Sequence, residues 1–421
     1  MKTKLCIKAA MEKLGLSKLR KHQSKPINAL LDHRDVLLIS PTGSGKSAIF
    51  QIPALVMHQK HSTWTLVIEP TLSLMEDQVH TLQKKGISAE YLSSRNEGDH
   101  KAILNRLSQH QIALLYVTPE RLQSFTFQQS VHYNSPWLVV VDEAHCILDW
   151  GSTFRHSYQK IKSFTKTLKR RPTIAALTAT APAEYRLRIC NSLQMENPIC
   201  FSHSLARSNI VLMQEDCSNL KLNSRLSRVS YHIKKYRNNG RVVVYCASRK
   251  NVDLVSNYLS KKFPNEVVKC HGYMDPSKRE QHELQFISGD KPIMVSSTAF
   301  GMGIDAKDIR LVVHFNLPLN AIDYYQQIGR AGRDNEKSHA VLLYHPDDIK
   351  LNRYILNQKQ YSEQLRTWLN KRFDELVSIL TSRKCLWEQL LQALGEDDAQ
   401  SCGRCTNCQR KRRSYHENSK D

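Results

Sequence analysis

Short apolar runs of three to six residues alternate with longer stretches of helical periodicity along most of the chain. Their length and their content of Val and Ile are typical of buried β-strands. In the first half of the chain the predicted strands are Val36–Ile39, Leu66–Ile68, Ile112–Val117, Trp137–Val141 and Ile174–Leu177. In the second half they are Val242–Tyr245, Val267–Lys269, Ile293–Val295, Val312–Phe315 and Val341–Tyr344.

Predicted helices lie between these strands, for example Leu72–Lys84, Asn251–Lys262 and Lys278–Ile287. Strands that alternate with helices indicate doubly wound parallel sheets of the α/β class. Two such series predict two tandem α/β domains, residues 1–205 and 206–346, with a boundary near Ser204–Asn209.

After Pro346 the strand pattern ends. Tyr361–Leu380 and Arg383–Leu394 have helical patterns, and a cysteine cluster accompanies them. We therefore predict a small helical subdomain over residues 347–408 and a loose basic tail over residues 409–421.

The composition adds a strong positive charge to this picture. The chain has 421 residues, and Lys and Arg outnumber Asp and Glu by 61 to 39, a formal net charge of +22. Such an excess favours a polyanionic partner, because phosphate contacts release counterions, although a basic solvated surface is the plainer interpretation. No apolar run reaches the roughly 20 residues that span a bilayer, and Met1–Leu19 has no secretion signal. We expect a cytoplasmic protein with no membrane partner.

A glycine-rich segment with the order of a phosphate-binding loop, Ser40–Ser47, joins the first predicted strand to a helix. Glycines let backbone N–H groups close around phosphate oxygens at the helix N-terminus. In this pattern Lys46 reaches the β- and γ-phosphates of a nucleotide, and the Ser47 hydroxyl binds Mg²⁺. The strict pattern has Gly or Ala where Ser40 stands, so a plain glycine-rich turn is the alternative. The other loop positions expected to contact the nucleotide are Thr42, Gly43, Ser44 and Gly45.

Two acidic residues, Asp142 and Glu143, follow the apolar run Leu138–Val141. A carboxylate at the carboxyl end of a buried strand lies where a phosphate loop needs its Mg²⁺ partner. We predict that Asp142 holds the metal through water and that Glu143 orients and deprotonates the attacking water. An isolated Asp-Glu pair is more often solvated surface, but the preceding strand makes this pair specific.

Two arginines three residues apart, Arg330 and Arg333, lie on or just after a predicted helix in the second α/β domain. Residues at this spacing share one face of a helix. Arginine stabilises the charge on a transferring γ-phosphoryl group when it is supplied across a cleft. We predict that domain closure over ATP brings both arginines to Lys46 and Glu143, and that hydrolysis releases them. The plain alternative is an arginine pair that binds surface carboxylates.

With these three elements in this order, the chain resembles the RecQ family of superfamily-two helicases over nearly all of residues 14–408. Leu14–Leu16, Arg20 and Gln23 are similar to the family motif in which the Arg stacks on adenine and the Gln reads its edge, which implies ATP. Ala299–Asp305 is close to a RecQ hallmark. Further motifs that carry the resemblance are Gln51–Leu55, Ser73–Val79, Tyr116–Leu122, Ala176–Ala181, Arg207–Ile210, Tyr245–Arg249 and His271–Gly272.

The resemblance also implies roles for further residues. Nucleotide contacts are implied for Leu16, Arg20, Gln23, Gly303 and Asp305. DNA contacts are implied for Thr118, Arg121, Ser248, Arg249 and His271. Coupling of ATP hydrolysis to DNA is implied for His145, Thr178, Thr180 and Gln326.

The segment Cys146–Tyr158 resembles the aromatic-rich loop that directly follows the acidic motif in this family. We predict that Trp150 and Phe154 stack on unpaired bases and that Arg155 contacts phosphate. Packing of the two rings in a core is the alternative, because they are four residues apart. The family usually has Gln, His and Asp at the positions of Asp149, Ser152 and Thr153.

Four of the 11 cysteines, Cys385, Cys402, Cys405 and Cys408, cluster near the end of the chain, with Cys385 on a predicted helix. Four thiolates suit a tetrahedral structural zinc site, while an iron–sulfur cluster and free cysteines are alternatives. The resemblance of this segment to the RecQ zinc-binding subdomain favours zinc. Cys246 and Cys270 lie in apolar runs and are predicted to be small core residues.

The resemblance implies two RecA-like domains, a helical zinc-binding subdomain and an ATP- and Mg²⁺-dependent 3′→5′ DNA helicase of repair and recombination. We expect a monomer whose partners are single-stranded and partly duplex DNA. Only 13 residues follow Cys408, so winged-helix and HRDC domains are expected to be missing. The alternatives are a DNA-stimulated translocase that unwinds poorly and a catalytically silent DNA-binding scaffold, with an RNA helicase less favoured.

Overall fold

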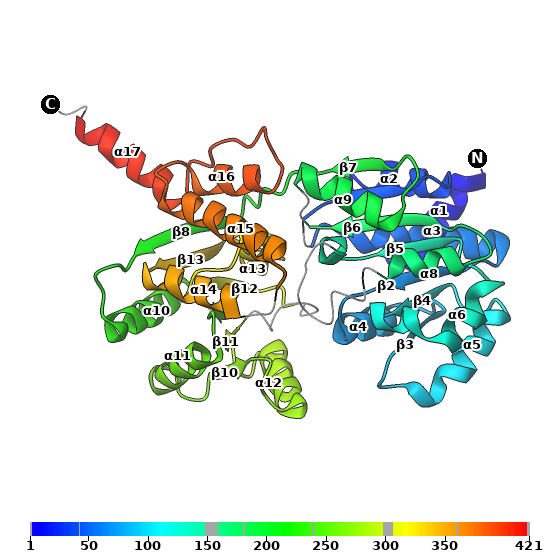
Figure 1. Ribbon diagram of the computed structural model, residues 1–421, viewed down its shortest axis with the longest axis horizontal. Helices are drawn as coiled ribbons and strands as arrows, with labels where there is room; N and C mark the ends of the chain where they lie inside the picture. The colour runs from blue at the N-terminus through cyan, green and yellow to red at the C-terminus, as the bar shows by residue number, and fades with distance from the viewer. Residues whose placement is uncertain are drawn as a thin grey trace. The chain divides into compact units, whose positions relative to one another are not determined.

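The computed structural model describes residues 2–41, 43–147, 158, 160–179, 182–237, 240–297, 306–358 and 361–418. The chain divides into two compact units, Met1–Ser204 and Leu205–Asp421. Each unit is built around one parallel β-sheet with helices packed against it (Figure 1). This architecture confirms the predicted pair of α/β domains.

The first unit contains a seven-stranded sheet with the order β3-β4-β2-β5-β6-β1-β7. All of its strand pairs are parallel. Its central strands are fully buried, as expected for strands covered by helices on both faces. The strands are β1 (Val36–Ile39), β2 (Thr65–Ile68), β3 (Ala89–Leu92), β4 (Leu114–Val117), β5 (Leu138–Val141), β6 (Thr173–Thr178) and β7 (Ile199–Ser202).

The helices of the first unit connect these strands. Helix α3 is buried at every position from Ala48 to Met57 except Gln51, so the phosphate loop that precedes it is anchored in the core. The helices are α1 (Lys2–Lys13), α2 (Ser24–Leu31), α3 (Lys46–His61), α4 (Leu72–Gln83), α5 (His100–Ser108), α6 (Phe125–His132), α8 (Ile161–Thr167) and α9 (Ala183–Leu193). Short 3₁₀ turns are η1 (Glu97–Asp99), η2 (Pro119–Gln123) and η3 (Ala144–Ile147).

The second unit contains a six-stranded parallel sheet with the order β10-β11-β9-β12-β13-β8. Cys246 and Cys270 are buried in it, which confirms their predicted place in the core. The strands are β8 (Ile210–Asp216), β9 (Arg241–Tyr245), β10 (Val267–Cys270), β11 (Ile293–Ser296), β12 (Ile309–His314) and β13 (Ser338–Tyr344). The helices that connect them are α10 (Leu222–Tyr236), α11 (Arg249–Lys262), α12 (Pro276–Ser288) and α13 (Ala321–Ile328).

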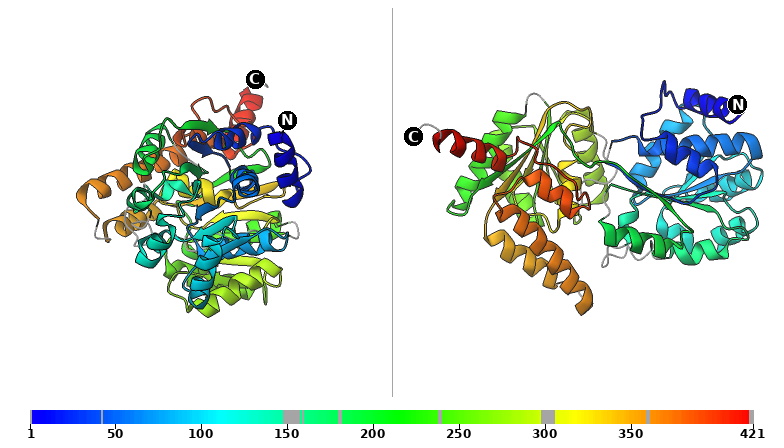
Figure 2. Two further views of the ribbon diagram at one scale, coloured as in Figure 1. Left: turned by 90° about the vertical axis from the view of Figure 1, so that its right-hand side faces the viewer. Right: turned by 90° about the horizontal axis from the view of Figure 1, so that it is seen from above.

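A helical segment follows the second sheet. Its helices are α14 (Asp347–Gln358), α15 (Glu363–Thr381), α16 (Leu386–Ala393) and α17 (Thr406–Asn418). Helices α14 and α15 lie side by side, in orange in Figure 2. The prediction that Cys385 lies on a helix was wrong, because α16 starts one residue later and Cys385 is its N-cap.

Three strands were not predicted from the sequence, and all three lie at edges of their sheets: β3, β7 and β8. The sequences of β3 (AEYL) and β8 (IVLMQED) carry polar residues, and the burial of β7 alternates. Edge strands are only partly covered, so they lack the continuous apolar run that marks a central strand. Among the described helices, none is long and apolar enough to cross a membrane.

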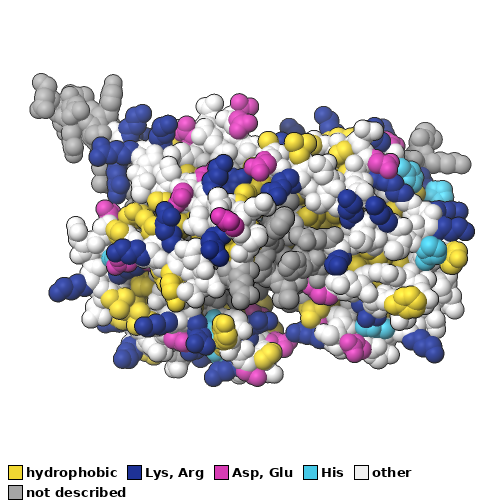
Figure 3. Space-filling model, viewed as in Figure 1, with side chains coloured by type: hydrophobic (Ala, Val, Ile, Leu, Met, Phe, Trp, Pro, Cys, Tyr) yellow, Lys and Arg dark blue, Asp and Glu magenta, His cyan; other side chains and the backbone are white. Residues whose placement is uncertain are grey.

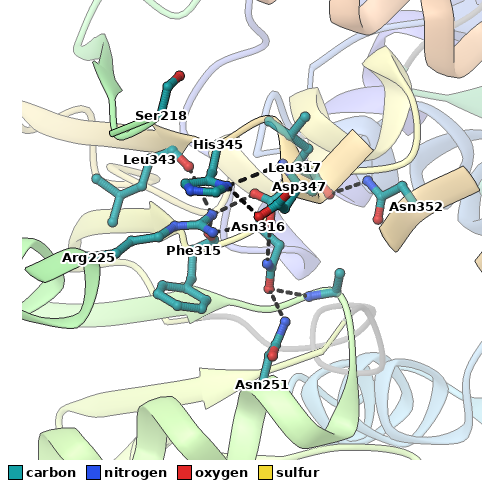
Figure 4. Close-up of polar contacts among 12 residues, drawn as sticks. Ser218, Arg225, Asn251, Phe315, Asn316, Leu317, Leu343, His345, Asp347 and Asn352 are labelled. Atoms are coloured by element: carbon teal, nitrogen blue, oxygen red, sulfur yellow. Dashed lines mark hydrogen bonds and ion pairs between the residues drawn. The ribbon is translucent and has the colours of Figure 1, made fainter. Parts of the chain in front are cut away.

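A buried ion pair fastens α14 to the sheet of the second unit (Figure 4). Arg225 of α10 donates to both carboxylate oxygens of Asp348, at 3.2 and 2.5 Å, and also to the carbonyl oxygens of Phe315 and Leu343. Asn316 donates to the same carboxylate at 2.7 Å. Arg225 and Asp348 are 6% and 2% exposed, so neither charge can be solvated by water if its partner is lost.

We expect Asp348→Ala to destabilise the second unit by about 3–5 kcal/mol, because it leaves the Arg225 charge buried and unpaired. A matched control is Asp374→Ala, which removes an exposed ion pair to Arg353 and should cost at most about 1 kcal/mol. Urea unfolding of the full chain measures both values. Equal losses in the two variants would contradict a structural role for the buried pair.

Candidate functional site

The phosphate loop lies between β1 and α3, at the carboxyl end of the first sheet. Gly43 and Gly45 have φ of +76° and +85°, in the left-handed region that side chains other than Gly avoid. A Cβ atom on Gly45 would lie 2.8 Å from Nε2 of Gln23. The two glycines therefore allow a tight backbone loop that no other residue type would permit without strain. Thr42 lies outside the described residues.

Ser40 occupies the loop position at which the strict pattern has Gly or Ala. Its side chain is fully buried, and its hydroxyl donates to Oγ of Ser44 at 2.7 Å. The hydroxyl is thus accommodated inside the loop by a hydrogen bond, and the departure from the pattern leaves the loop geometry intact. Ser47 lies in the first turn of α3.

Two residues that precede β1, Arg20 and Gln23, donate hydrogen bonds to the phosphate loop. Gln23 donates from Nε2 to the Gly45 carbonyl at 3.0 Å and accepts the Arg20 backbone N–H at 2.8 Å. Arg20 donates from Nη1 to the Gly43 carbonyl at 3.2 Å. Leu16 packs against the core of the first unit. The structure therefore brings the predicted adenine-contacting residues directly to the phosphate loop.

The ammonium group of Lys46 is the main cation of this site. Its Nζ atom is buried, has no hydrogen-bond partner among the described residues, and lies 4.0 Å from Oε1 of Glu143. A buried ammonium without hydrogen bonds is costly in a protein interior. Phosphate oxygens would supply the missing acceptors, so the donor set fits a nucleotide phosphate.

The predicted metal ligand Asp142 follows β5 directly. Its Oδ1 atom accepts the backbone N–H of Glu143 at 2.8 Å, and Glu143 has a positive φ of +46°. Burial raises the pKa of the Asp142 carboxyl to about 6, with a further contribution from Glu143, while Lys46 lowers it. A second positive charge, such as Mg²⁺, would restore the ionised form, so the carboxylates fit a divalent cation.

A third carboxyl group, Glu69, was missed by sequence reasoning. It follows β2, is fully buried, and accepts a hydrogen bond from Gln78 Nε2 at 2.8 Å. Its pKa is raised well above the ordinary value by burial and by the charges of Asp142 and Glu143. Strands β2 and β5 are neighbours, so residues that follow them lie side by side. A correct strand order would have revealed Glu69 from the sequence.

Buried polar contacts link the acidic residues to β6. His145 Nδ1 lies 3.2 Å from Oγ1 of Thr178 and 3.3 Å from Oε2 of Glu143. The Tyr158 hydroxyl donates to the carbonyl oxygen of Asp142 at 3.2 Å. The predicted coupling residues His145 and Thr178 are therefore joined to the acidic pair. Predicted residues that lie outside the described part of the first unit are Trp150, Phe154, Arg155 and Thr180.

In the second unit, α13 carries Gln326 and ends at Ile328, and Arg330 and Arg333 lie on the turn that follows. The prediction that the two arginines share a helical face was wrong. Gly329 caps the helix, and Gly332 has a positive φ of +56°, which is incompatible with a continuing helix. Both guanidinium groups lie near the buried Tyr245 hydroxyl: burial raises its pKa, and their charges oppose that rise.

Arg207 and Asn209 hold this arginine turn, which we define as residues 329–333. Buried Arg207 donates to the carbonyl oxygens of Gly329, Ala331 and Gly332, the last at 2.8 Å. Asn209 Nδ2 donates to the Gly332 carbonyl at 2.8 Å. Sequence reasoning recognised Arg207–Ile210 as a motif but gave it no role, because its partners lie more than a hundred residues away.

The predicted DNA contacts fall on strand ends in both units. Thr118 follows β4 and precedes η2, on which Arg121 lies. Ser248 is the N-cap of α11, Arg249 is its first residue, and His271 follows β10. The structure thus gathers Ser248, Arg249 and His271 at one edge of the second sheet. The predicted nucleotide contacts Gly303 and Asp305 lie outside the described residues.

The four sulfur atoms of Cys385, Cys402, Cys405 and Cys408 lie within 4.8 Å of one another. Individual Sγ–Sγ distances are 3.5 Å for Cys385–Cys402, 3.8 Å for Cys385–Cys405 and 3.5 Å for Cys405–Cys408. A tetrahedral zinc ion with Zn–S bonds of about 2.3 Å places its sulfur ligands about 3.8 Å apart. The cluster therefore fits zinc without rearrangement.

The zinc module, residues 385–408, packs on the edge strand β8. Trp387 donates from Nε1 to the Ile210 carbonyl at 3.1 Å, and the Gln214 backbone N–H donates to Thr406 at 2.9 Å. Arg404, between two of the cysteines, donates to the Arg207 carbonyl at 3.3 Å. The module thus covers an exposed sheet edge and contacts the residue that holds the arginine turn.

Comparison with known families gives three matches in chain order. Residues 20–187 match the DEAD/DEAH box helicase family, residues 224–335 the helicase conserved C-terminal domain, and residues 346–409 the RecQ zinc-binding family. The last match and the four-cysteine cluster together support a structural zinc ion.

Individual relatives agree with these matches. The ATP-dependent DNA helicase RecQ of Bacillus subtilis is 34% identical over 396 residues, which cover 94% of this chain and 65% of the relative. The probable ATP-dependent DNA helicase RecS of the same organism is 33% identical over 352 residues, 83% of this chain and 69% of the relative. The chain spans less than two thirds of the length of that RecQ relative. A crystal structure of the DUF1998 helicase MrfA bound to DNA has a TM-score of 0.69 at 21% identity and covers 85% of this chain and 54% of that one, a likeness of fold alone.

Removal of the Asp142 charge is expected to stabilise the ligand-free protein above pH 6. The pKa of the Asp142 carboxyl rises from 3.8 to about 6 on folding. Between these two pH values the folded state therefore holds a proton that the unfolded chain has released. The stability contributed by that proton is present below pH 4 and is lost as pH rises to about 6. Asp142→Asn should equal wild type near pH 4 and exceed it by on the order of 2 kcal/mol at pH 7.

Urea unfolding without Mg²⁺ or nucleotide measures this difference at each pH. Asp32→Asn, which changes an exposed carboxyl in the same unit, is the control and should show no such trend. A difference between Asp142→Asn and wild type that is constant from pH 4 to pH 7 would contradict the raised pKa.

Cys405→Ser is expected to release the bound zinc and to lower the melting temperature of the second unit, because a structural metal site contributes folding free energy. Metal analysis of the purified protein and thermal melting measure the two effects. Cys200→Ser, at an exposed cysteine outside the cluster, should change neither. Full zinc content in the Cys405→Ser protein would overturn the assignment of this ligand.

Proposed function

The chain belongs to the RecQ family of helicases, and from that premise we propose that it is an ATP- and Mg²⁺-dependent DNA helicase with 3′→5′ polarity. The observation that carries the proposal is the buried ammonium of Lys46, which has no hydrogen-bond partner in the described part of the chain and lies beside the carboxyl groups of Asp142 and Glu143. A site of this kind fits a Mg²⁺-bound nucleotide phosphate and has no evident structural purpose without one.

In the proposed mechanism Lys46 binds the β- and γ-phosphates of ATP, and Ser47 and Asp142 would hold Mg²⁺. The bound metal would neutralise charge that develops on the phosphate oxygens. Glu143 orients the attacking water and accepts its proton. The left-handed backbone of Glu143 and its contact with His145 fix the direction of this carboxylate.

Arg330 and Arg333 are proposed to stabilise the γ-phosphoryl group when the two units close on ATP. Arg207 holds the backbone of the turn from which both side chains extend, through hydrogen bonds to the carbonyl oxygens of Gly329, Ala331 and Gly332. Loss of the γ-phosphate would remove the shared ligand and allow the units to separate. Repeated closing and opening would then move the protein along a DNA strand.

DNA is the proposed polyanionic partner. Figure 3 shows Lys and Arg side chains spread over the visible face of each unit, in line with the net charge of +22. We assign strand contacts to Thr118 and Arg121 in the first unit and to the Ser248–His271 edge in the second. Thr178 and His145 join β6 to the catalytic carboxylates, so they are proposed to report DNA occupancy to the ATP site.

We assign residues 1–205 and 206–346 as the helicase domains, 347–408 as the zinc-binding subdomain and 409–421 as a basic tail. The prediction that this tail is loose was wrong, because α17 forms a helix as far as Asn418. Roles in DNA repair and recombination, a cytoplasmic location and a monomeric state are predictions of the same proposal.

Strand separation on 3′-tailed, 5′-tailed and blunt duplexes tests the proposed function. With ATP and Mg²⁺ the wild-type protein should separate the 3′-tailed duplex alone. Lys46→Ala should lower the rate on the order of a hundredfold or more, because it removes a buried phosphate contact. Lys101→Ala, at an exposed position of the same unit, should keep the wild-type rate. Separation of no duplex by wild type, or full activity in Lys46→Ala, would contradict the proposal.

A further inference from the structure

A hollow of about 500 Å³ opens at the carboxyl end of the edge strand β10 in the second unit. Arg249, the first residue of α11, and Asp275, the N-cap of α12, line it, so the N-terminal ends of both helices, which carry partial positive charge, flank the hollow. A volume of this size accommodates one nucleotide. The residues that line it are Arg249, Asp253, Lys269, His271, Tyr273, Met274, Asp275 and Lys278.

His271 lines the hollow, and one nitrogen of its ring has no hydrogen-bond partner in the described part of the chain. His271 is 7% exposed, and its Nδ1 atom is buried without a hydrogen-bond partner among the described residues. Its Nε2 atom lies 3.8 Å from Oδ1 of Asp253, which is itself paired with Lys269 at 2.6 Å. A buried ring nitrogen without a partner is costly, so it favours a ligand atom that would complete it.

The rim of the hollow presents an exposed aromatic ring. Tyr273 is 83% exposed, and the guanidinium carbon of Arg249 lies 4.9 Å from the centre of its ring. This cation–π contact holds one face of the ring and leaves the other open. A ring exposed to this degree beside cationic side chains is accessible to a nucleic-acid base.

The buried network of Figure 4 fixes the position of Arg249. Asn316 Oδ1 accepts hydrogen bonds from the Ala247 backbone N–H at 3.1 Å and from Asn251 Nδ2 at 2.9 Å (Figure 4). Asn316 in turn donates from Nδ2 to the Asp348 carboxylate. Ser248 caps α11 through the Asn251 N–H at 3.2 Å. The start of α11 is therefore tied to the core, and Arg249 presents its charge from a rigid support.

The charges around the hollow favour an anion. Arg249 and Lys278 are exposed at its rim, whereas the acidic residues already have partners. Asp253 pairs with Lys269, which helps to hold the pKa of its carboxyl below the ordinary value. Asp275 caps α12 by accepting the backbone N–H groups of Ser277 and Lys278. The cationic side chains are thus available to a phosphate.

We propose that this hollow binds one nucleotide of single-stranded DNA, with its base stacked on Tyr273, its phosphate held by Arg249 and Lys278, and a hydrogen bond to His271 Nδ1. The inference rests on the proposed function and adds a base-stacking subsite to it. Stacking on a tyrosine face is independent of sequence, because every base has a π-face. Such a contact suits a motor that must step along any strand.

Equilibrium binding of a fluorescein-labelled oligothymidylate, without nucleotide, tests this subsite by anisotropy. Tyr273→Ala should weaken binding by between about fivefold and a hundredfold, the range of a lost base–aromatic stack. Tyr273→Phe keeps the ring and should retain the wild-type affinity. The control Tyr354→Ala changes another exposed tyrosine of the same unit, on α14, and should bind as wild type.

Salt titration separates stacking from charge. Arg249→Ala should reduce the slope of log affinity against log salt concentration by about one, whereas Tyr273→Ala should leave the slope unchanged. Wild-type affinity in Tyr273→Ala, or equal weakening in Tyr273→Ala and Tyr273→Phe, would overturn the stacking subsite while leaving the proposed function intact. Failure of the wild-type protein to bind the oligonucleotide would overturn both.

Discussion

The candidate site of the first unit is governed by the free-energy cost of burying charged side chains. At the carboxyl ends of β1, β2 and β5, one ammonium group faces the carboxyl groups of Glu69, Asp142 and Glu143. Burial and mutual repulsion raise the pKa values of Glu69 and Asp142, so this cluster of carboxyl groups lowers the stability of the folded unit. A phosphate group would accept hydrogen bonds from the Lys46 ammonium, and a divalent cation would offset the repulsion among the carboxylates. These buried charges are the physical basis of the proposal that the site binds a metal-bound nucleotide.

In the second unit two buried arginines, Arg207 and Arg225, have hydrogen-bond partners and serve to position other residues. Arg207 uses its guanidinium to hold the arginine turn, and its own carbonyl accepts a hydrogen bond from Arg404 of the zinc module. The Arg225–Asp348 pair holds α14 and, through Asn316, the start of α11. Small elements with little core of their own, such as the zinc module, are thus connected to the residues proposed to contact ATP and DNA.

The central strands and the phosphate loop could be predicted from the sequence alone. Central strands of parallel sheets are continuous apolar runs, and a phosphate loop has a fixed order of glycine, lysine and hydroxyl residues. Val36–Ile39 followed by Ser40–Ser47 specifies both strand and loop. The rest depends on which strands are neighbours. Glu69 is part of the site only because β2 adjoins β5, and Arg207 acts on a turn more than a hundred residues away. Edge strands such as β8 escape prediction because they are only partly covered and carry polar residues, so no continuous apolar run marks them.

The most direct test of this account is the rate of ATP hydrolysis by the wild-type protein, with Mg²⁺, in the presence and absence of single-stranded DNA. If the buried site hydrolyses ATP to drive movement along DNA, single-stranded DNA should raise the turnover number for ATP severalfold or more. Binding of ATP without any turnover when single-stranded DNA is supplied would contradict the account.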